Sequence, residues 1–167
     1  MVGLRGDRLG PVDARAIVAN HFGSVTFIEP TEEGVAVVRA VTNAVRALSG
    51  RATHGVRFFV AANQEGGLIQ SLKGPGFSMI PSALEQGRLS AATLEADATA
   101  WGRQLLAAGV NLDLAPVMDV VPPGTDDQNA PIGALRREYG HDPDTVSSRG
   151  VAFIHGLQRA EIGRAHV

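Results

Sequence analysis

Apolar residues in this chain gather into three runs that are rich in β-branched or aromatic side chains and show little alternation with polar ones. The runs are SVTFI at 24–28, VRFFVAA at 56–62 and VNLDLAPVMDV at 110–120. Uninterrupted apolar runs of this length are typical of strands that are buried on both faces. The pattern therefore predicts three strands of a parallel sheet.

Helical periodicity, with apolar positions three or four residues apart, alternates with these runs. The segments that carry it are 11–21, 31–48, 94–108 and 142–157. Thr31 is expected to be the N-cap of one helix, and Asp142, followed by proline, the N-cap of another. Gly109 is the residue type that ends a helix in the left-handed conformation. The order of strands and helices predicts βαβ units and an α/β fold.

Local patterns leave two α/β architectures open, a doubly wound sheet and the first part of a (β/α)8 barrel. Two long stretches rich in glycine and proline, 63–82 and 121–143, each follow a predicted strand. The carboxyl ends of strands are where α/β proteins build their sites. A complete barrel needs about 200 residues or more, so 167 residues can supply only part of one.

Composition narrows the range of partners. Fifteen Lys and Arg against seventeen Asp and Glu give a net charge of −2, without the basic patch that nucleic-acid binding requires. The absence of cysteine excludes disulfides and thiolate nucleophiles. No run of about 18 apolar residues and no apolar leader is present, so neither a membrane span nor a signal peptide is expected. The expected partner is a small or neutral molecule, and a cytoplasmic or a secreted location both remain open.

The string NQEGG at 63–67 directly follows the second predicted strand and can be interpreted in two ways. Paired glycines allow a ligand to approach the backbone closely. They are equally typical of a tight turn, in which Glu65 would cap a backbone group. The residues alone favour the turn.

Several carboxylates lie near the ends of the predicted strands, and Asp119 closes the third run. The others are Glu65, Asp113, Asp126 and Asp127. A pair of carboxylates is the machinery of glycoside hydrolysis, but its assignment depends on their separation in space. We therefore assign no catalytic pair from the sequence.

Other kinds of site have little support. The histidines are His21, His54, His141, His155 and His166. They show no close ligand pairing, so no metal site is predicted. Gly74-Pro75-Gly76 lacks the spacing of a phosphate-binding loop, and the nucleophile elbow GxSxG is absent.

Successive strings nevertheless resemble, in order, the N-terminal barrel domain of glycoside hydrolase family 3, and most of all its β-N-acetylhexosaminidase branch. They are NQEGG, GPGFSMIPSALEQGRL, WGRQLLAAGVNLDLAPVMDV, PIGALRREYGHDP and VAFIHGLQ, within residues 20–160. The resemblance implies that residues 1–161 form roughly the first three to four βα units of a (β/α)8 TIM barrel. It also implies retaining hydrolysis of β-linked sugars without an obligatory metal or cofactor.

The resemblance suggests roles for individual residues. Asn63 stands where the family usually has an aspartate that holds sugar hydroxyls, and Leu68 and Ser71 stand where the family often has arginine. Asn63, Ser71 and Arg137 are the substrate-binding candidates, with Arg137 matching the family's arginine before an aromatic residue. Glu65 and Asp119 are expected to support the site without touching the sugar.

The family's catalytic residues have no counterpart in this chain. A Lys-His-Phe-Pro-Gly block, a histidine-bearing loop with the general acid/base and a nucleophilic aspartate would all follow the helix ending near Ala160. Instead the chain ends in IGRAHV, which corresponds to one reading frame of a common sequencing adapter and predicts a non-native tail at 162–167. No catalytic residue is therefore expected here.

For the intact parent, the resemblance implies hydrolysis of terminal β-linked N-acetylglucosamine or a related sugar. A β-glucosidase of the same family and a non-catalytic sugar-binding paralogue are the alternatives. The second alternative is suggested by the departures at Asn63, Leu68 and Ser71.

Overall fold

A parallel sheet passes through the molecule, and its strands lie side by side in the order in which they occur in the sequence. The computed structural model describes residues 1–5 and 7–164. The strands are β1 (Val2–Leu4), β2 (Ser24–Phe27), β3 (Phe59–Ala62), β6 (Leu112–Asp113) and β7 (Gly163–Arg164). Every neighbouring pair is parallel, for example with Val25 beside Val60.

The strand order confirms the partial barrel that the family resemblance implied and that local patterns alone left open. A doubly wound sheet reverses its order at a switch point, whereas the strands of a barrel follow one another around it. Among the described residues the order runs β1-β2-β3-β6-β7 without reversal. The chain therefore has the winding of a (β/α)8 barrel, and the described sheet is open, with β1 and β7 at its edges.

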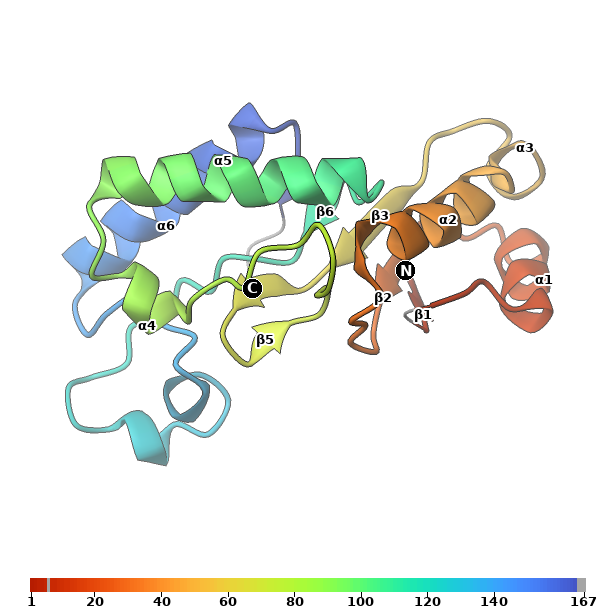
Figure 1. Ribbon diagram of the computed structural model, residues 1–167. Coiled ribbons are helices and arrows are strands. Elements are labelled where there is room, and N and C mark those ends of the chain that lie inside the picture. Colours follow the sequence, from red (N-terminus) through yellow and green to blue (C-terminus); the bar gives the residue numbers. More distant parts are fainter. Residues whose placement is uncertain (6, 165–167) are drawn as a thin grey trace.

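Helices connect successive strands of this sheet (Figure 1). They are α1 (Pro11–Ala19), α2 (Gly34–Arg46), α3 (Ser49–Ala52), α4 (Ala83–Gln86), α5 (Ala91–Ala107) and α6 (Pro143–Arg159). The two longest, α5 and α6, pack along each other, with the rings of Trp101 and Phe153 6.2 Å apart. None of the helices in the described ranges is both long and apolar enough to cross a bilayer.

The predicted ends of α5 and α6 are confirmed. Gly109 follows α5 with a φ of 82°, and Asp142 caps α6 by accepting a hydrogen bond from the Thr145 backbone N–H at 2.8 Å. Left-handed glycine at the end and a short acidic side chain at the start satisfy backbone groups that the helix leaves open. The end of α5 and the start of α6 are therefore determined by local sequence signals.

The prediction that Thr31 caps α2 is wrong. The helix starts at Gly34, with Glu33 at the N-cap position. Thr31 instead forms a parallel bridge to Leu72, donating its N–H to the Ser71 carbonyl at 2.8 Å. The backbone of Thr31 thus pairs with the 63–82 stretch, a contact that no local sequence pattern predicts.

The third apolar run forms much less strand than predicted. Only Leu112–Asp113 belongs to β6, and the residues that follow have no regular structure up to the short 3-10 helices η1 (Asp126–Gln128) and η2 (Gly133–Leu135). Pro116 lies in this run, and proline cannot donate a hydrogen bond to a sheet. The strand accordingly ends before it.

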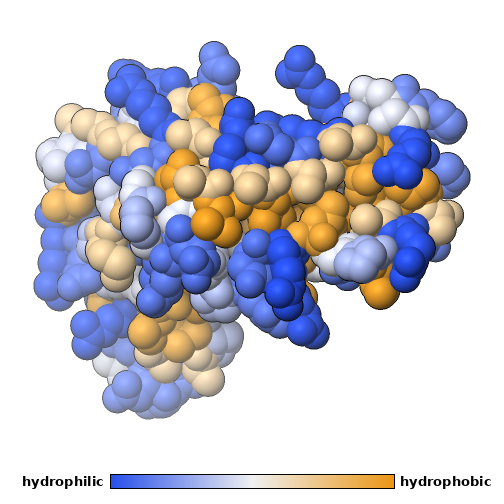
Figure 2. Space-filling view, turned by 45° about the vertical axis from the view of Figure 1, so that its right-hand side comes forward, coloured by the Kyte–Doolittle hydropathy of each residue, from blue (hydrophilic) through white to orange (hydrophobic). Residues whose placement is uncertain are grey.

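Not every apolar position is buried, contrary to the expectation of strands covered on both faces. Phe59, the first residue of β3, is 58% exposed. Figure 2 shows apolar groups in a broken band across one face of the molecule. An open sheet leaves such surface uncovered, whereas a closed barrel would not.

The end of the described chain continues the sheet. Ile162 is buried, and β7 pairs with β6 through Gly163 beside Leu112. Residues 165–167, in the second half of the predicted tail, lie outside the described residues. A non-native origin of 162–167 stays a prediction.

Candidate functional site

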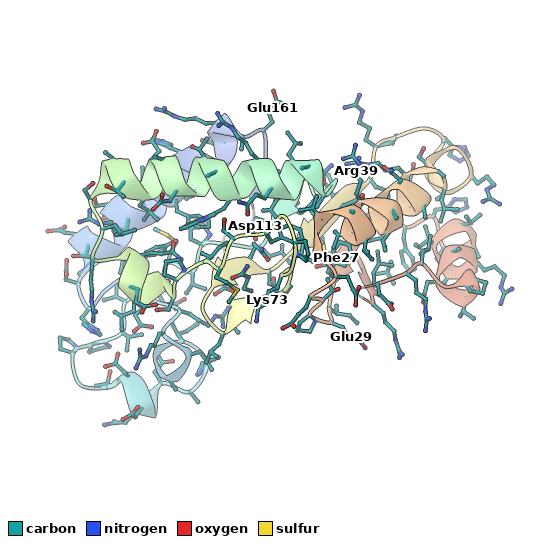
Figure 3. The ribbon with its side chains drawn as sticks, viewed as in Figure 1. Phe27, Glu29, Arg39, Lys73, Asp113 and Glu161 are labelled. Carbon is teal, nitrogen blue, oxygen red and sulfur yellow. The ribbon has the colours of Figure 1, made fainter. Side chains whose placement is uncertain are left out.

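The candidate residues gather at the carboxyl-terminal end of the sheet, where the neighbouring strands β3 and β6 end. Asn63 directly follows β3, and Asp113 closes β6. The Asp113 carboxylate accepts a hydrogen bond from the Gln64 backbone N–H at 3.0 Å, which ties the two strand ends together. Figure 3 shows Asp113 beside the antiparallel hairpin that follows, β4 (Gln64–Gly66) with β5 (Ile69–Gln70).

Buried glutamines hold this hairpin in place. The Gln64 side chain donates to the Leu72 carbonyl at 2.8 Å and accepts from the Leu72 N–H at 3.0 Å. Gln70 donates to the Ser78 carbonyl at 2.8 Å and accepts from the Ile80 N–H at 2.9 Å. A buried amide that uses both its donor and its acceptor fixes the backbone it contacts.

The glycines of NQEGG are required by the turn. Gly66 and Gly67 have φ of 108° and 55°, a region that other residues rarely adopt. A Cβ on Gly66 would also collide with the Pro81 carbonyl oxygen and lie 2.6 Å from Ile80 Cγ2. The turn interpretation is confirmed for the glycines, whereas the expectation that Glu65 caps a backbone group is wrong.

Glu65 pairs with Arg137 instead. Arg137 donates from Nε to Oε2 at 2.8 Å and from Nη2 to Oε1 at 2.7 Å. The side chains are 5% exposed for Glu65 and 19% exposed for Arg137. Hydrogen bonding to Glu65, and then the charges of Glu65 and Asp119, raise the pKa of Arg137 against the opposing effect of burial. The pair is a rigid two-point contact of the kind that orients a guanidinium.

Arg137 keeps hydrogen-bonding capacity beyond this pair. Its Nη1 donates to the Pro131 carbonyl at 2.9 Å, so three of the five N–H groups of a guanidinium have partners. The remaining two have none among the described residues. A polar molecule at this edge of the sheet could therefore be held by Arg137 without breaking an existing contact.

The other predicted site residues lie around the same hairpin. Asn63 and Ser71 are half-buried and flank it, with the Ser71 N–H donating to the Asn63 carbonyl at 2.9 Å. Asp119 is exposed, and its charge acts on Arg137. In the described part of the chain, no side-chain hydrogen bond links Asn63, Ser71 or Asp119 to Arg137.

Asp113 is the most perturbed acid near the site. It is fully buried, and one of its two oxygens, Oδ2, has no hydrogen-bond partner among the described residues. Burial raises the pKa of Asp113 to about 7, and the charge of Glu65 acts in the same direction. Tyr139, also buried, has its pKa raised by burial and by the charges of Asp113 and Glu65.

Gln86 supports the site, although it was not among the residues predicted from the sequence. Its side-chain amide donates to the Glu65 carbonyl at 2.8 Å and to the Pro81 carbonyl at 2.7 Å. Gln86 is the last residue of α4, which starts with a capping box between Ser82 and Glu85. That Ser-x-x-Glu signal is readable in the sequence and could have located the helix.

The arrangement favours binding over bond cleavage. Glu65 is engaged by Arg137, and Asp113 is sealed from solvent. Neither carboxylate is free to attack a substrate or to transfer a proton to one. What the site offers a ligand is the outer edge of the Arg137 guanidinium, with Asn63 and Ser71 on the hairpin nearby.

Known proteins resemble this chain over nearly its whole length. Residues 8–166 match the family model for the glycosyl hydrolase family 3 N-terminal domain. A β-hexosaminidase of Hydrogenovibrio crunogenus is 28% identical over 167 residues, which are 96% of this chain and 43% of that protein. The chain thus spans less than half the length of this curated relative.

Solved structures give the same result. The crystal structure of a β-N-acetylhexosaminidase from Beutenbergia cavernae matches all of this chain and 50% of its own, with 45% identity and a TM-score of 0.97. NagZ from Neisseria gonorrhoeae matches with a TM-score of 0.83 at 20% identity, over all of this chain and 48% of its own, a likeness of fold. The chain superimposes on about half of each of these proteins.

Proposed function

The chain belongs to the N-terminal domain family of glycosyl hydrolase family 3, and from this premise we propose that it forms part of the sugar-binding rim of a retaining β-N-acetylhexosaminidase. The parent protein releases terminal β-linked N-acetylglucosamine or a related sugar. The names of the relatives from Hydrogenovibrio and Beutenbergia support this choice of sugar. The observation that carries the proposal is the Arg137 guanidinium, fixed by Glu65 and left with two unpartnered donors.

Arg137 has the chemistry that a sugar hydroxyl needs. Its two remaining N–H groups are directed donors whose orientation is already set by Glu65 and Pro131. A preorganised donor loses little conformational entropy when the ligand binds, so more of the contact energy appears as affinity. Arg137 therefore positions the sugar for the reaction.

Asn63 and Ser71 complete the polar contacts in this proposal. Asn63 can both donate and accept a hydrogen bond but brings no charge, so its contact with a hydroxyl is weaker than that of a carboxylate. Leu68, 73% exposed on the turn of the hairpin, adds no charge either. The sugar is thus held with fewer charge-assisted contacts than the family pattern implies, which marks a branch with altered recognition.

The bond-breaking groups belong to the parent protein. In a retaining mechanism an aspartate attacks the anomeric carbon and forms a glycosyl-enzyme intermediate, while a separate group protonates the leaving oxygen. The same group then activates the water that releases the sugar. Glu65 and Asp113 take neither role, because one is paired and the other is buried.

The test is hydrolysis of chromogenic glycosides by the parent protein that continues this sequence. We expect release of p-nitrophenol from p-nitrophenyl N-acetyl-β-glucosaminide, and little from the β-glucoside. A preference for the glucoside would support the β-glucosidase alternative. Binding of N-acetylglucosamine without hydrolysis of either compound would support a sugar-binding paralogue.

A further inference from the structure

The stretch between β6 and α6 brings together three potential metal ligands that are separated in sequence. Asp126 lies in η1, and Glu138 and His141 lie shortly before α6. One carboxylate oxygen from each acid and one ring nitrogen of His141 all lie within 4.8 Å of one another. Ligand atoms around a single cation, each bound at about 2.0–2.6 Å, have separations of this size.

The Glu138 carboxyl lies against the Asp126 carboxyl and meets no hydrogen-bond donor among the described residues. The residue is 0% exposed, and both of its carboxylate oxygens are buried without a partner among the described residues. Asp126 Oδ1 faces the same cluster and is also buried without a hydrogen-bond partner among the described residues. Buried carboxylate oxygens are normally hydrogen-bonded or bound to a metal. A partner for these buried carboxylate oxygens is therefore missing at the centre of the cluster.

His141 places a ring nitrogen at the cluster. Its Nδ1 lies 2.9 Å from the Val121 carbonyl oxygen and 3.7 Å from Asp126 Oδ1. The nitrogen that lies beside Asp126 is Nδ1, so binding through it requires the tautomer with the proton on Nε2, and the cation would replace the contact with Val121.

We propose that Asp126, Glu138 and His141 bind one divalent cation, with Zn²⁺ preferred. Zn²⁺ accepts both imidazole nitrogen and carboxylate oxygen, and sites with three protein ligands leave room for a water molecule. Mg²⁺ and Ca²⁺ prefer sets made of oxygen alone, which His141 does not fit. Two carboxylates also balance the charge of the cation.

A cation here would clamp the loop that carries Arg137. Asp126 and His141 lie at either end of that segment, and Arg137 directly precedes Glu138 in it. Arg137 Nη1 donates to the Pro131 carbonyl within the same segment. The site is thus structural, and it would hold the Arg137 guanidinium in the position where it pairs with Glu65. It does not depend on which sugar the parent protein binds.

These ligands do not form a short motif, so no metal site was predicted from the sequence. Asp126 is twelve positions before Glu138, and only Glu138 and His141 are close in sequence. The loop closes the larger gap through η1 and η2, whose backbones pack together. The grouping exists only in three dimensions.

The experiment is calorimetric titration of the metal-stripped chain with zinc chloride, without sugar. We expect one ion per chain, and a Kd raised at least about tenfold by Glu138→Gln, which keeps the size but removes the charge. Asp127→Asn is the matched control, because Asp127 is exposed in the same short helix, outside the cluster, and its loss should leave Kd unchanged.

His141→Ala keeps the proposal testable if Glu138→Gln does not fold. His141 is about one third exposed, so its replacement is compatible with folding, and it too should weaken zinc binding at least about tenfold. Absence of zinc binding would overturn the proposal. So would binding that His141→Ala and Asp126→Asn leave unchanged, which would place the ion elsewhere, for instance at the stacked rings of His21 and His54.

Discussion

Arg137 and Glu65 are 72 positions apart in the sequence and share two parallel hydrogen bonds of 2.8 and 2.7 Å. Glu65 comes from the hairpin after β3, and Arg137 from the loop before α6. Their pair joins the two long loops at the carboxyl end of the sheet. Because Gln86 holds the Glu65 backbone at the same time, α4 fixes the position of the pair.

Glu65→Gln should destabilise the fold by about 2–3 kcal/mol. The substitution leaves Arg137 without its countercharge in a largely buried position, and the 19% exposure of Arg137 keeps the cost below that of a fully buried pair. Urea unfolding measures the change. Glu95→Gln is the control, since its partner Arg159 is 71% exposed and the loss should stay below about 1 kcal/mol. Equal effects of the two substitutions would contradict the structural role of the Glu65 pair.

Asp113 should make the fold less stable as the pH rises from about 4 to 7. The pKa of Asp113 is raised from 3.8 to about 7 by burial, so between these values the unfolded chain releases a proton that the folded chain keeps. The associated loss of stability is up to about 4 kcal/mol and is complete above about pH 7. Urea unfolding at a series of pH values measures it.

Asp113→Asn is the matching variant for that pH series. Asparagine resembles the protonated acid and can still accept the hydrogen bond from the Gln64 N–H. It should reduce the dependence of stability on pH between 4 and 7, and the pKa of Glu138, also raised by burial, leaves a smaller slope of the same sign. A slope as steep as that of the natural sequence would assign the effect to a group other than Asp113.

Gly66→Ala should cost more than about 2 kcal/mol, because alanine at a φ of 108° is strained and its Cβ meets the Pro81 carbonyl. Gly50→Ala is the comparison, since Gly50 lies in α3 with nothing within 4 Å of the added carbon. That change should leave stability unchanged or raise it by up to about 1 kcal/mol. Thermal unfolding of both variants measures these changes in stability. A Gly66→Ala variant as stable as the natural sequence would show that the turn is not tightly constrained.

The 167-residue chain by itself should not hydrolyse p-nitrophenyl N-acetyl-β-glucosaminide. Its best-placed acids are engaged or sealed, as Glu65 and Asp113 are. A sensitive fluorogenic assay on the purified chain measures this. Turnover that follows the chain through successive purification steps would refute the assignment of the catalytic groups to the rest of the parent.

The sequence predicted the features whose causes are local. The caps at Asp142 and Gly109 and the three apolar runs depend on neighbours within a few residues, and they led to the correct α/β class. The same information misplaced the start of α2, because Thr31 is held by Ser71 and Leu72 rather than by the helix.

Contacts between distant segments could not be predicted from local patterns, and the barrel was predicted only through the family resemblance. The consecutive strand order that identifies the barrel depends on which strands pair, and the apolar runs are compatible with either order. The partner of Glu65 and the burial of Asp113 depend on how the loops close over the sheet. In the sequence, nothing distinguishes Gln64, Gln70 and Gln86 from ordinary polar residues, although their side-chain amides hold the hairpin in place.

The role of Arg137 is tested by the kcat/KM of the parent protein for p-nitrophenyl N-acetyl-β-glucosaminide, compared between the natural sequence and Arg137→Lys. Lysine keeps the charge but cannot pair with Glu65 through two bonds and still offer directed donors to the sugar. We expect a fall of about 100-fold, equivalent to about 2.7 kcal/mol of transition-state stabilisation. An unchanged kcat/KM would contradict the claim that Arg137 holds the substrate.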